Sequence, residues 1–475
     1  MSAERAGGGI AGHPRGLTTL FLTEFWERFS YYGMRAILLL FMVASPEAGG
    51  LGLATDRAAW IYGLYTGSVY LATIPGGIIA DRILGLKRAV LAGGILIALG
   101  HYSLALHSVQ ELFFAGLLLI VLGTGLLKAN ISAIVGKLYG PDDERRDAGF
   151  SIFYMGINLG AFVSPFICGY LGQKVGWHWG FGAAGVGMTL GLVQYVLGAK
   201  RLESAGVERE PSKDAGKSWL LVSAAVIATG AALILSGQYR DYLIAGSAAA
   251  LFAWLLARGT EDRVERKRIA AIALLFIFAS LFWMGFEQAG SSLTLFADRL
   301  TDNQLLGWSF PSSWYQSVEP FFVITLAPAF AWMWTRLRSR APSSPAKFAI
   351  ALSLLSVSFF VIAYASRLFD QQQLKVGPGW LVGVYLLHAL GELSLSPIGL
   401  SMVSKLAPAR ILGFIMGIWF LTNAVGNFTA GSVAGFFDRL PLPQLFGAVG
   451  LVALIATVVL VALTRPIRGL MSGVR

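Results

Sequence analysis

The residues most able to do chemistry in this sequence are acids and bases that stand inside long apolar stretches. On insertion scales, an ionisable side chain at the centre of a lipid bilayer costs about 2.5–3.5 kcal/mol, so such residues persist where they face a polar cavity or one another. Five acids and three bases occupy positions of this kind, which indicates an internal polar site. These residues are Glu24, Glu27, Arg28, Arg35, Lys128, Glu287, Glu319 and Glu392.

Helical geometry brings the ionisable residues of the first apolar stretch to one face. At about 100° per residue, the other three charged residues of this stretch fall within about 60° of Glu24 around the helix axis. The phenols of Tyr31 and Tyr32 lie on the same face, and Gly33 lies opposite. One helix therefore presents two carboxylates, two cations and two phenols to a single cavity. The alternative is a buried salt-bridge cluster that only fixes packing.

Depth along the helices separates the charged residues into two levels. At about 1.5 Å per residue, Arg28 and Lys128 lie ~16 Å and Glu392 ~19 Å from the expected cytoplasmic ends of their helices. Arg35 and Glu287 lie about 27 Å from those ends, which predicts an outer ion pair that acts as a gate. The central group of two cations and one acid suits a ligand with a carboxylate at one end and an ammonium at the other, such as an amino acid or a short peptide.

The composition of the whole chain shows where these helices must lie. Of the 475 residues, 56% are hydrophobic and 13% are charged, whereas soluble domains carry about 25% charged residues. A cytosolic enzyme, a nucleic-acid-binding protein and a secreted disulfide scaffold are therefore all unexpected, and the single Cys168 excludes an intramolecular disulfide. We attribute the formal charge of +11 to Lys and Arg in cytoplasmic loops. The predicted fold class is an all-α membrane protein.

Fourteen stretches are long and apolar enough to cross a bilayer, which takes about 20 residues per helix. If the N-terminus is cytoplasmic, Lys and Arg are about four times more numerous in the inner loops than in the outer ones, as the positive-inside rule requires. Both termini are then cytoplasmic. The predicted spans are 17–43, 58–80, 88–107, 111–135, 148–170, 178–198, 218–237, 241–258, 269–297, 314–335, 347–367, 379–403, 410–434 and 444–464.

The seventh and eighth spans differ from the others, because they are rich in Ala, Leu and Val and carry no ionisable residue in their interiors. The chain therefore divides into six spans, two inserted spans and six more, the arrangement of a two-half transporter that binds its substrate between the halves. The predicted parts are a tail (1–16), a six-helix bundle (17–199), the inserted pair with cytoplasmic linkers (200–268), a second six-helix bundle (269–465) and a tail (466–475).

The loop between the second and third spans reads GGIIADRILGLKR over Gly76–Arg88. This pattern resembles the loop motif of the major facilitator superfamily, in which glycines permit close helix approach. The resemblance implies that Asp81 and Arg82 form a gate by pairing across the cytoplasmic ends of helices. An ordinary basic inner loop is the alternative.

The first span carries a more specific resemblance. Glu24–Gly33 reads EFWERFSYYG, which is similar to the E-x-x-E-R-F-x-Y-Y-G motif of the proton-dependent oligopeptide transporters, and FYMGINLGAF (Phe153–Phe162) resembles that family's second signature. The inserted helix pair looks like that of the bacterial branch. Further similar segments are GTGLLKANIS (Gly123–Ser132), FEQAGSSLTLFADR (Phe286–Arg299) and GELSLSPIGLS (Gly391–Ser401).

The resemblance implies a multi-pass protein of the bacterial plasma membrane that imports di- and tripeptides with protons. It implies that the peptide carboxylate binds Arg28 and Lys128 and the peptide ammonium binds Glu392. Glu319 departs from the family, which usually has Asn before this proline, so its role as a ligand-binding or proton-binding residue stays open. The other implied substrate-binding residues are Tyr31, Tyr32, Tyr70, Asn158, Ser396 and Trp419, and the implied proton-coupling residues are Glu24, Glu27, Glu287 and Glu392.

Other interpretations have less support in the sequence. No nucleophile motif or metal-ligand spacing occurs, so we expect no enzyme activity, no cofactor and no metal. The expected partners are peptides, protons and membrane lipid, without nucleic acid. His388 is more consistent with packing than with a proton relay, and we expect His101 and His107 at a membrane interface. A same-fold facilitator for nitrate, an amino acid or a drug, and a non-transporting membrane sensor, remain alternatives.

Overall fold

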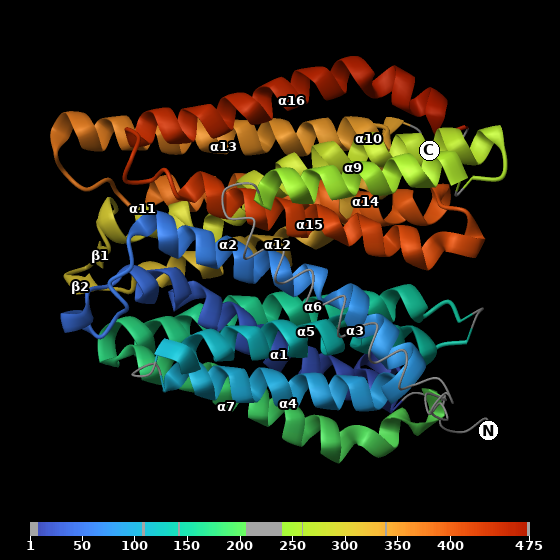
Figure 1. The fold of residues 1–475 in the computed structure, drawn as a ribbon, viewed down its shortest axis with the longest axis horizontal. Coiled ribbons are helices and arrows are strands. Elements are labelled where there is room, and N and C mark those ends of the chain that lie inside the picture. The colour runs from blue at the N-terminus through green and yellow to red at the C-terminus, as the bar shows by residue number, and fades with distance from the viewer. Residues whose placement is uncertain are drawn as a thin grey trace. The chain divides into compact units, whose positions relative to one another are not determined.

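A computed structural model describes residues 8–106, 110–140, 143–205, 240–258, 260–337 and 340–472. Helices make up nearly all of this part of the chain, which confirms the predicted all-α class (Figure 1). The strands among the described residues are β1 (Gln304–Leu305) and β2 (Trp308–Ser309), a two-stranded antiparallel pair. Nine helical segments of the described residues are long and apolar enough to cross a membrane.

Thirteen of the fourteen predicted spans coincide with helical segments, and the other, 218–237, lies outside the described residues. The α-helices are α1 (Arg15–Val43), α2 (Thr55–Leu71), α3 (Thr73–Ile79), α4 (Leu86–Ala105), α5 (Gln110–Lys137), α6 (Arg146–Ser164), α7 (Trp177–Gly198), α9 (Arg240–Arg258), α10 (Arg263–Phe286), α11 (Ser292–Arg299), α12 (Val318–Leu337), α13 (Ser344–Gln372), α14 (Gly379–Leu406), α15 (Leu412–Ala434) and α16 (Leu442–Leu470).

Several predicted spans are interrupted by other helical turns. The second span divides into α2, α3 and the π-helical turn η3 (Ala80–Leu84), and the ninth divides at the 3-10 turn η8 (Glu287–Gly290) into α10 and α11. The fifth continues from α6 into the π-helical turns η4 (Pro165–Gly169) and η5 (Leu171–Val175). Pro165 lacks a backbone N–H, which explains why the regular ladder of α6 changes there. Glu287 and Asp81 both lie in such irregular turns.

The chain forms two compact units. Unit 1 takes in the described residues of Met1–Gly52, Ser68–Ala232 and Phe310–Pro320, and unit 2 takes in those of Leu53–Gly67, Leu233–Ser309 and Phe321–Arg475. Each unit thus recruits a short segment from the other half of the sequence. The first part of α2 belongs to unit 2, and the segment that leads into α12 belongs to unit 1.

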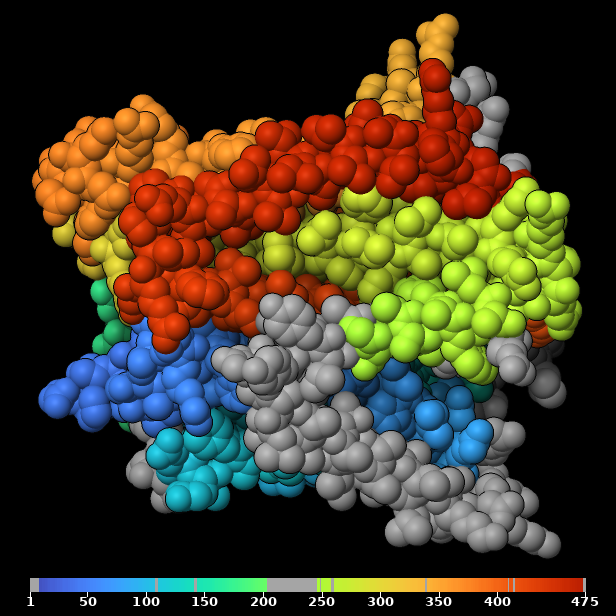
Figure 2. Space-filling model, turned by 45° about the horizontal axis from the view of Figure 1, so that its top comes forward, coloured from blue at the N-terminus to red at the C-terminus, as the bar shows by residue number. Residues whose placement is uncertain are grey.

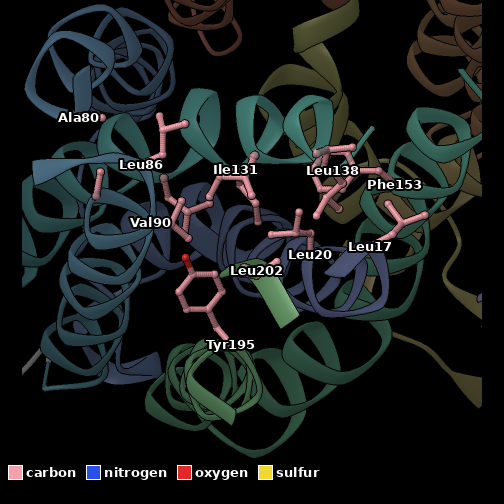
Figure 3. Packing of buried hydrophobic residues seen from close by; sticks show 14 of the residues in the cluster. Leu17, Leu20, Ala80, Leu86, Val90, Ile131, Leu138, Phe153, Tyr195 and Leu202 are labelled. Carbon is pink, nitrogen blue, oxygen red and sulfur yellow. The ribbon is translucent and has the colours of Figure 1, made fainter. Parts of the chain in front are cut away.

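Unit 1 is held together by apolar packing among α1, α4, α5, α6 and α7, with Leu17, Ile131 and Tyr195 among its buried residues (Figure 3). The crossing of α4 and α5 is close because glycines meet there. A Cβ atom on Gly93 would lie 2.5 Å from the carbonyl oxygen of Gly123, and a Cβ on Gly123 would lie 2.5 Å from that of Gly93. Only glycine fits at both positions.

The short connection between α5 and α6 is stabilised by one ion pair. The Asp143 carboxylate accepts hydrogen bonds from Nε of Arg145 at 3.0 Å and from Nη2 at 2.9 Å. These bonds favour the ionised carboxylate and lower the pKa of Asp143 to about 2. The pair therefore keeps its charges at any pH near neutrality.

Unit 2 is built from α10 and α13–α16, with α9 packed against α10 and α15. Phe252 of α9 lies edge-on against Phe276 of α10, with ring centroids 5.2 Å apart. Figure 2 shows the α9–α10 segment in yellow-green on the same face as the red α16. Asp262 caps α10, since its side chain accepts a hydrogen bond from the backbone N–H of Glu265 at 2.7 Å.

Candidate functional site

The centre of the candidate site is an ion cluster on one face of α1. Nε of Arg28 lies 3.0 Å from Oε1 of Glu24 and 2.5 Å from Oε2 of Glu27. All three side chains are almost fully buried, with 3% or less of their surface exposed. The predicted single charged face of this helix is therefore present.

The cluster leaves hydrogen-bonding capacity unused. Nη2 of Arg28, Oε2 of Glu24 and Oε1 of Glu27 are buried without a hydrogen-bond partner in the described part of the chain. A buried polar atom in this condition costs about 1–3 kcal/mol. A guanidinium with a spare donor edge can accept a ligand carboxylate, and a carboxylate with a spare oxygen can accept a proton.

Lys128 of α5 belongs to the same cluster. Its Nζ lies 3.9 Å from the ring centroid of Tyr70 on α2, and its charge acts on the Glu24 carboxylate. Arg28 interacts in turn with the ring of Tyr31, at 5.5 Å from the centroid. Unit 1 therefore brings together two predicted cations, two predicted acids and the predicted phenols.

The outer end of the charged face of α1 carries a second cation. The guanidinium carbon of Arg35 lies 5.9 Å from the ring centroid of Tyr32, and the rings of Tyr31 and Tyr32 meet edge to face at 5.3 Å. Arg35 is buried, with 6% of its surface exposed. The two phenols thus lie between the level of Arg28 and the level of Arg35.

Asn158 lies on α6, a helix that packs closely against α1. A Cβ atom on Gly160 would lie 2.4 Å from the carbonyl oxygen of Phe25 and 3.0 Å from Cβ of Arg28, so only glycine allows this approach. Asn158 is buried and donates a hydrogen bond from its amide to the Tyr154 carbonyl at 3.1 Å. Gly160 is a positioning residue that the sequence analysis did not single out. Its position within the signature segment FYMGINLGAF could have indicated that it matters.

Glu319 reaches unit 1 because the turn before it docks there. In the 3-10 turn η9 (Ser312–Ser317), Ser312 accepts a hydrogen bond from the Gln173 amide at 2.9 Å. The backbone N–H of Ser313 donates to the same side chain at 3.0 Å. A Cβ atom on Gly169 would come within 2.1 Å of the Ser313 hydroxyl, so a larger residue there would force the Ser313 side chain to move. Glu319 follows on the first turn of α12 and is half-buried.

Unit 2 carries four of the predicted site residues. Glu392 and Ser396 lie one turn apart on α14, and Pro397 interrupts the hydrogen-bond ladder of that helix directly after them. Trp419 of α15 is buried and packs over Gly399, where an added Cβ would lie 2.7 Å from the indole. Glu287 is buried in η8.

Three predicted pairings remain predictions. The predicted central group would link two residues of unit 1, Arg28 and Lys128, to Glu392 of unit 2. The predicted outer pair would likewise link Arg35 of unit 1 to Glu287 of unit 2. Asp81 and its neighbour Arg82 lie exposed in η3. Their predicted pairing across helix ends also remains to be tested.

Two of the histidines considered in the sequence analysis are buried. His388 of α14 is fully buried, bonds the Ser358 hydroxyl at 3.0 Å and stacks on Phe286 at 5.6 Å, which is a packed environment. None of the surface of His101, near the end of α4, is exposed, and its predicted place at a membrane interface stays a prediction. Apolar packing of α4 inside unit 1 encloses this side chain. His107 lies outside the described residues.

Comparisons with known proteins place this site in a family. A sequence model described as "POT family" matches residues 87–449. The peptide transporter YePEPT of Yersinia enterocolitica is 42% identical over 97% of this chain and 96% of its own length. The di-/tripeptide transporter of Lactococcus lactis subsp. cremoris is 36% identical over 98% of both chains.

A solved structure shows the same architecture. The crystal structure of the peptide transporter POT in complex with sulfate matches with a TM-score of 0.91 and 42% identity, over 99% of this chain and 98% of that one. The match extends through all of the helices that carry the candidate site. This chain is a multi-pass membrane protein with the major facilitator superfamily fold, and it belongs to the POT family.

Proposed function

We propose that this protein imports di- and tripeptides together with protons by alternating access. The observation that carries the proposal is the buried Glu24–Arg28–Glu27 cluster with Lys128 beside it. Relatives named as peptide transporters support the substrate class. An enzyme is not expected, because the buried charges are arranged to hold a ligand rather than a nucleophile.

Each end of the peptide has a matching group in the proposal. The peptide carboxylate binds the spare donor edge of Arg28 and the ammonium of Lys128, and the peptide ammonium binds Glu392. Charge-assisted hydrogen bonds of this type are roughly twice as strong as neutral ones. The remaining proposed contacts with the peptide are made by Tyr31, Tyr32, Tyr70, Asn158, Glu319, Ser396 and Trp419.

Charge balance explains why a proton accompanies the peptide. Glu24 and Glu27 carry two negative charges, and Arg28 and Lys128 carry two positive ones, so the empty cluster is neutral. A peptide carboxylate adds one negative charge in a buried place, where an uncompensated charge is expensive. A proton taken up by Glu24 or Glu27 restores neutrality. Once these acids and the further proton sites Glu287 and Glu392 are neutralised, the outer gate of Arg35 and Glu287 is free to rearrange.

The driving force available to this coupling is substantial. Each proton that crosses a potential of 100 mV supplies about 2.3 kcal/mol, before the pH gradient is counted. In this scheme the two halves rock about the occupied site, and the pair of Asp81 and Arg82 holds the inner side closed until they do.

The test uses purified protein in vesicles with an inward acid gradient and labelled dialanine. We expect uphill accumulation by the wild type. Glu24→Gln and Glu27→Gln should still exchange dialanine across the membrane but lose accumulation, since the proton site is gone while the cations remain. Exchange serves as the control for folding. Undiminished uphill uptake by both variants would refute the coupling, and failure of the wild type to exchange dialanine would refute the peptide substrate.

A further inference from the structure

Two lysines lie at one end of unit 2, in stretches of sequence that lack acids. The sequence has no Asp or Glu from 320 to 369 or from 393 to 437, stretches that contain nearly all of α12 and α13, the last part of α14 and all of α15. The acids Glu261 and Glu265 pair instead with Arg410, a short way after Lys405. Both Lys347, at the start of α13, and Lys405, at the end of α14, lie in these stretches. The described residues form no ion pair with either lysine.

Lys347 contacts the indole of Trp334, and we call Trp334, Lys347 and Lys405 the Trp334 cluster. Nζ of Lys347 lies 4.3 Å from the ring centroid of Trp334, near the end of α12. Lys405 is close enough for its positive charge to oppose that of Lys347. Nε1 of Trp334 is buried and has no hydrogen-bond partner in the described part of the chain.

An anion would make this arrangement more favourable. Two like charges oppose each other at the edge of a low-dielectric region, and a buried N–H without an acceptor costs about 1–3 kcal/mol. A chloride ion could neutralise charge, but a group with several oxygens around one atom can also accept hydrogen bonds from more than one donor. A phosphate group has that geometry, and lysine is a common phosphate ligand.

We propose that the Trp334 cluster is a binding site for a phosphate group. The positive-inside pattern assigns this end of unit 2 to the cytoplasmic side, where anionic phospholipid headgroups attract basic residues. A headgroup phosphate and a dissolved phosphate ion share the required chemistry. The proposal does not depend on the identity of the transported substrate, since none of the three residues is among those assigned to the peptide.

The experiment measures the unfolding temperature of the purified full chain in detergent during titration with phosphatidylglycerol, phosphatidylcholine or inorganic phosphate. Phosphatidylglycerol should stabilise the wild type more than phosphatidylcholine does. Lys347→Gln/Lys405→Gln should raise the apparent dissociation constant about 30-fold, since each basic residue near an anionic surface contributes roughly fivefold. Lys137→Gln, at the end of α5 in unit 1, is the matched control and should titrate like the wild type.

Two further variants and the titration with inorganic phosphate distinguish the possible explanations of binding. Lys347→Arg/Lys405→Arg keeps the charge and should retain binding, and Trp334→Phe should weaken it while preserving the packing of the ring. Stabilisation by inorganic phosphate that equals that of phosphatidylglycerol would identify a soluble ligand at the same site. Equal titrations of the wild type and the double Gln variant, or no response to either phosphate source, would overturn the proposal.

Discussion

At the scale of single residues, Arg28 holds two carboxylates that have few other partners. It contacts Glu24 and Glu27 through the same nitrogen, and the remaining oxygens of both acids are buried. A lysine would replace a planar fork by a point charge and could not offer a second edge to a ligand. The cluster is therefore costly to keep and sensitive to the loss of any one member.

Removal of Arg28 alone should destabilise the protein more than removal of the whole cluster. Arg28→Met leaves two buried acids without their cation, a change that typically costs about 3–5 kcal/mol. The triple variant Glu24→Gln/Glu27→Gln/Arg28→Met removes the two acids together with Arg28, leaves Lys128 as the one charge of the cluster, and should recover part of the lost unfolding temperature in detergent. Arg82→Met, at an exposed position, is the control. A triple variant less stable than Arg28→Met would contradict this account.

At the scale of elements, glycines decide how closely the site helices approach. Gly160 allows α6 to lie against the backbone of α1 at the level of Arg28, and Gly169 allows η9 to dock on η4. The first contact sets the position of α6, the helix that carries Asn158, and the second brings Glu319 into unit 1. The polar residues of the site thus depend on residues that have no side chain.

Gly160→Ala should separate α6 from α1, because the new methyl group would meet backbone rather than a movable side chain. Overpacking of this kind costs about 1–3 kcal/mol. We expect a lower unfolding temperature and a higher KM for dialanine, with kcat less affected. The matched control is Gly182→Ala on α7, where an added Cβ meets nothing within 4 Å. Equal behaviour of the two variants would show that the α1–α6 contact does not position the site.

At the scale of the whole molecule, the proposed transport requires that the peptide engage both halves of the sequence. Arg28 and Lys128 belong to unit 1, and Glu392 belongs to unit 2. A ligand with two opposite charges is suited to link them, whereas a ligand that lacks one charge leaves one half without its contact. This distinguishes a peptide from a simple anion such as nitrate.

Blocked peptides test this arrangement. N-acetyl-dialanine should compete with labelled dialanine at least about tenfold more weakly than dialanine on the wild type, because a hydrogen bond between charged groups is worth about 1.5–3 kcal/mol. Glu392→Gln should shrink that difference, while dialanine amide, which lacks the carboxylate, should remain a poor competitor. If both proteins discriminate equally against the acetylated peptide, Glu392 does not bind the peptide ammonium.

The spans and the charged face of α1 could be predicted because both follow from local properties. Apolar length decides which segments can cross a bilayer, and the cost of a charge in hydrocarbon marks Glu24, Glu27 and Arg28 as site residues. The same charges keep α1 from meeting a simple hydropathy criterion for a span, although it is a continuous helix of 29 residues. The repeating angle of a helix was enough to place them together.

Other features depend on contacts between segments that are distant in the sequence. Neither the docking of η9 on unit 1 nor the position of Lys128 over Tyr70 has a local signal, since each depends on how closely two helices pack. The division into bundles at 199 and 269 stays a prediction. Local composition fixes which residues enter the membrane, because hydration and length act on each segment separately. Tertiary packing decides which of them meet, because the closest approach of two helices depends on the side chains of both.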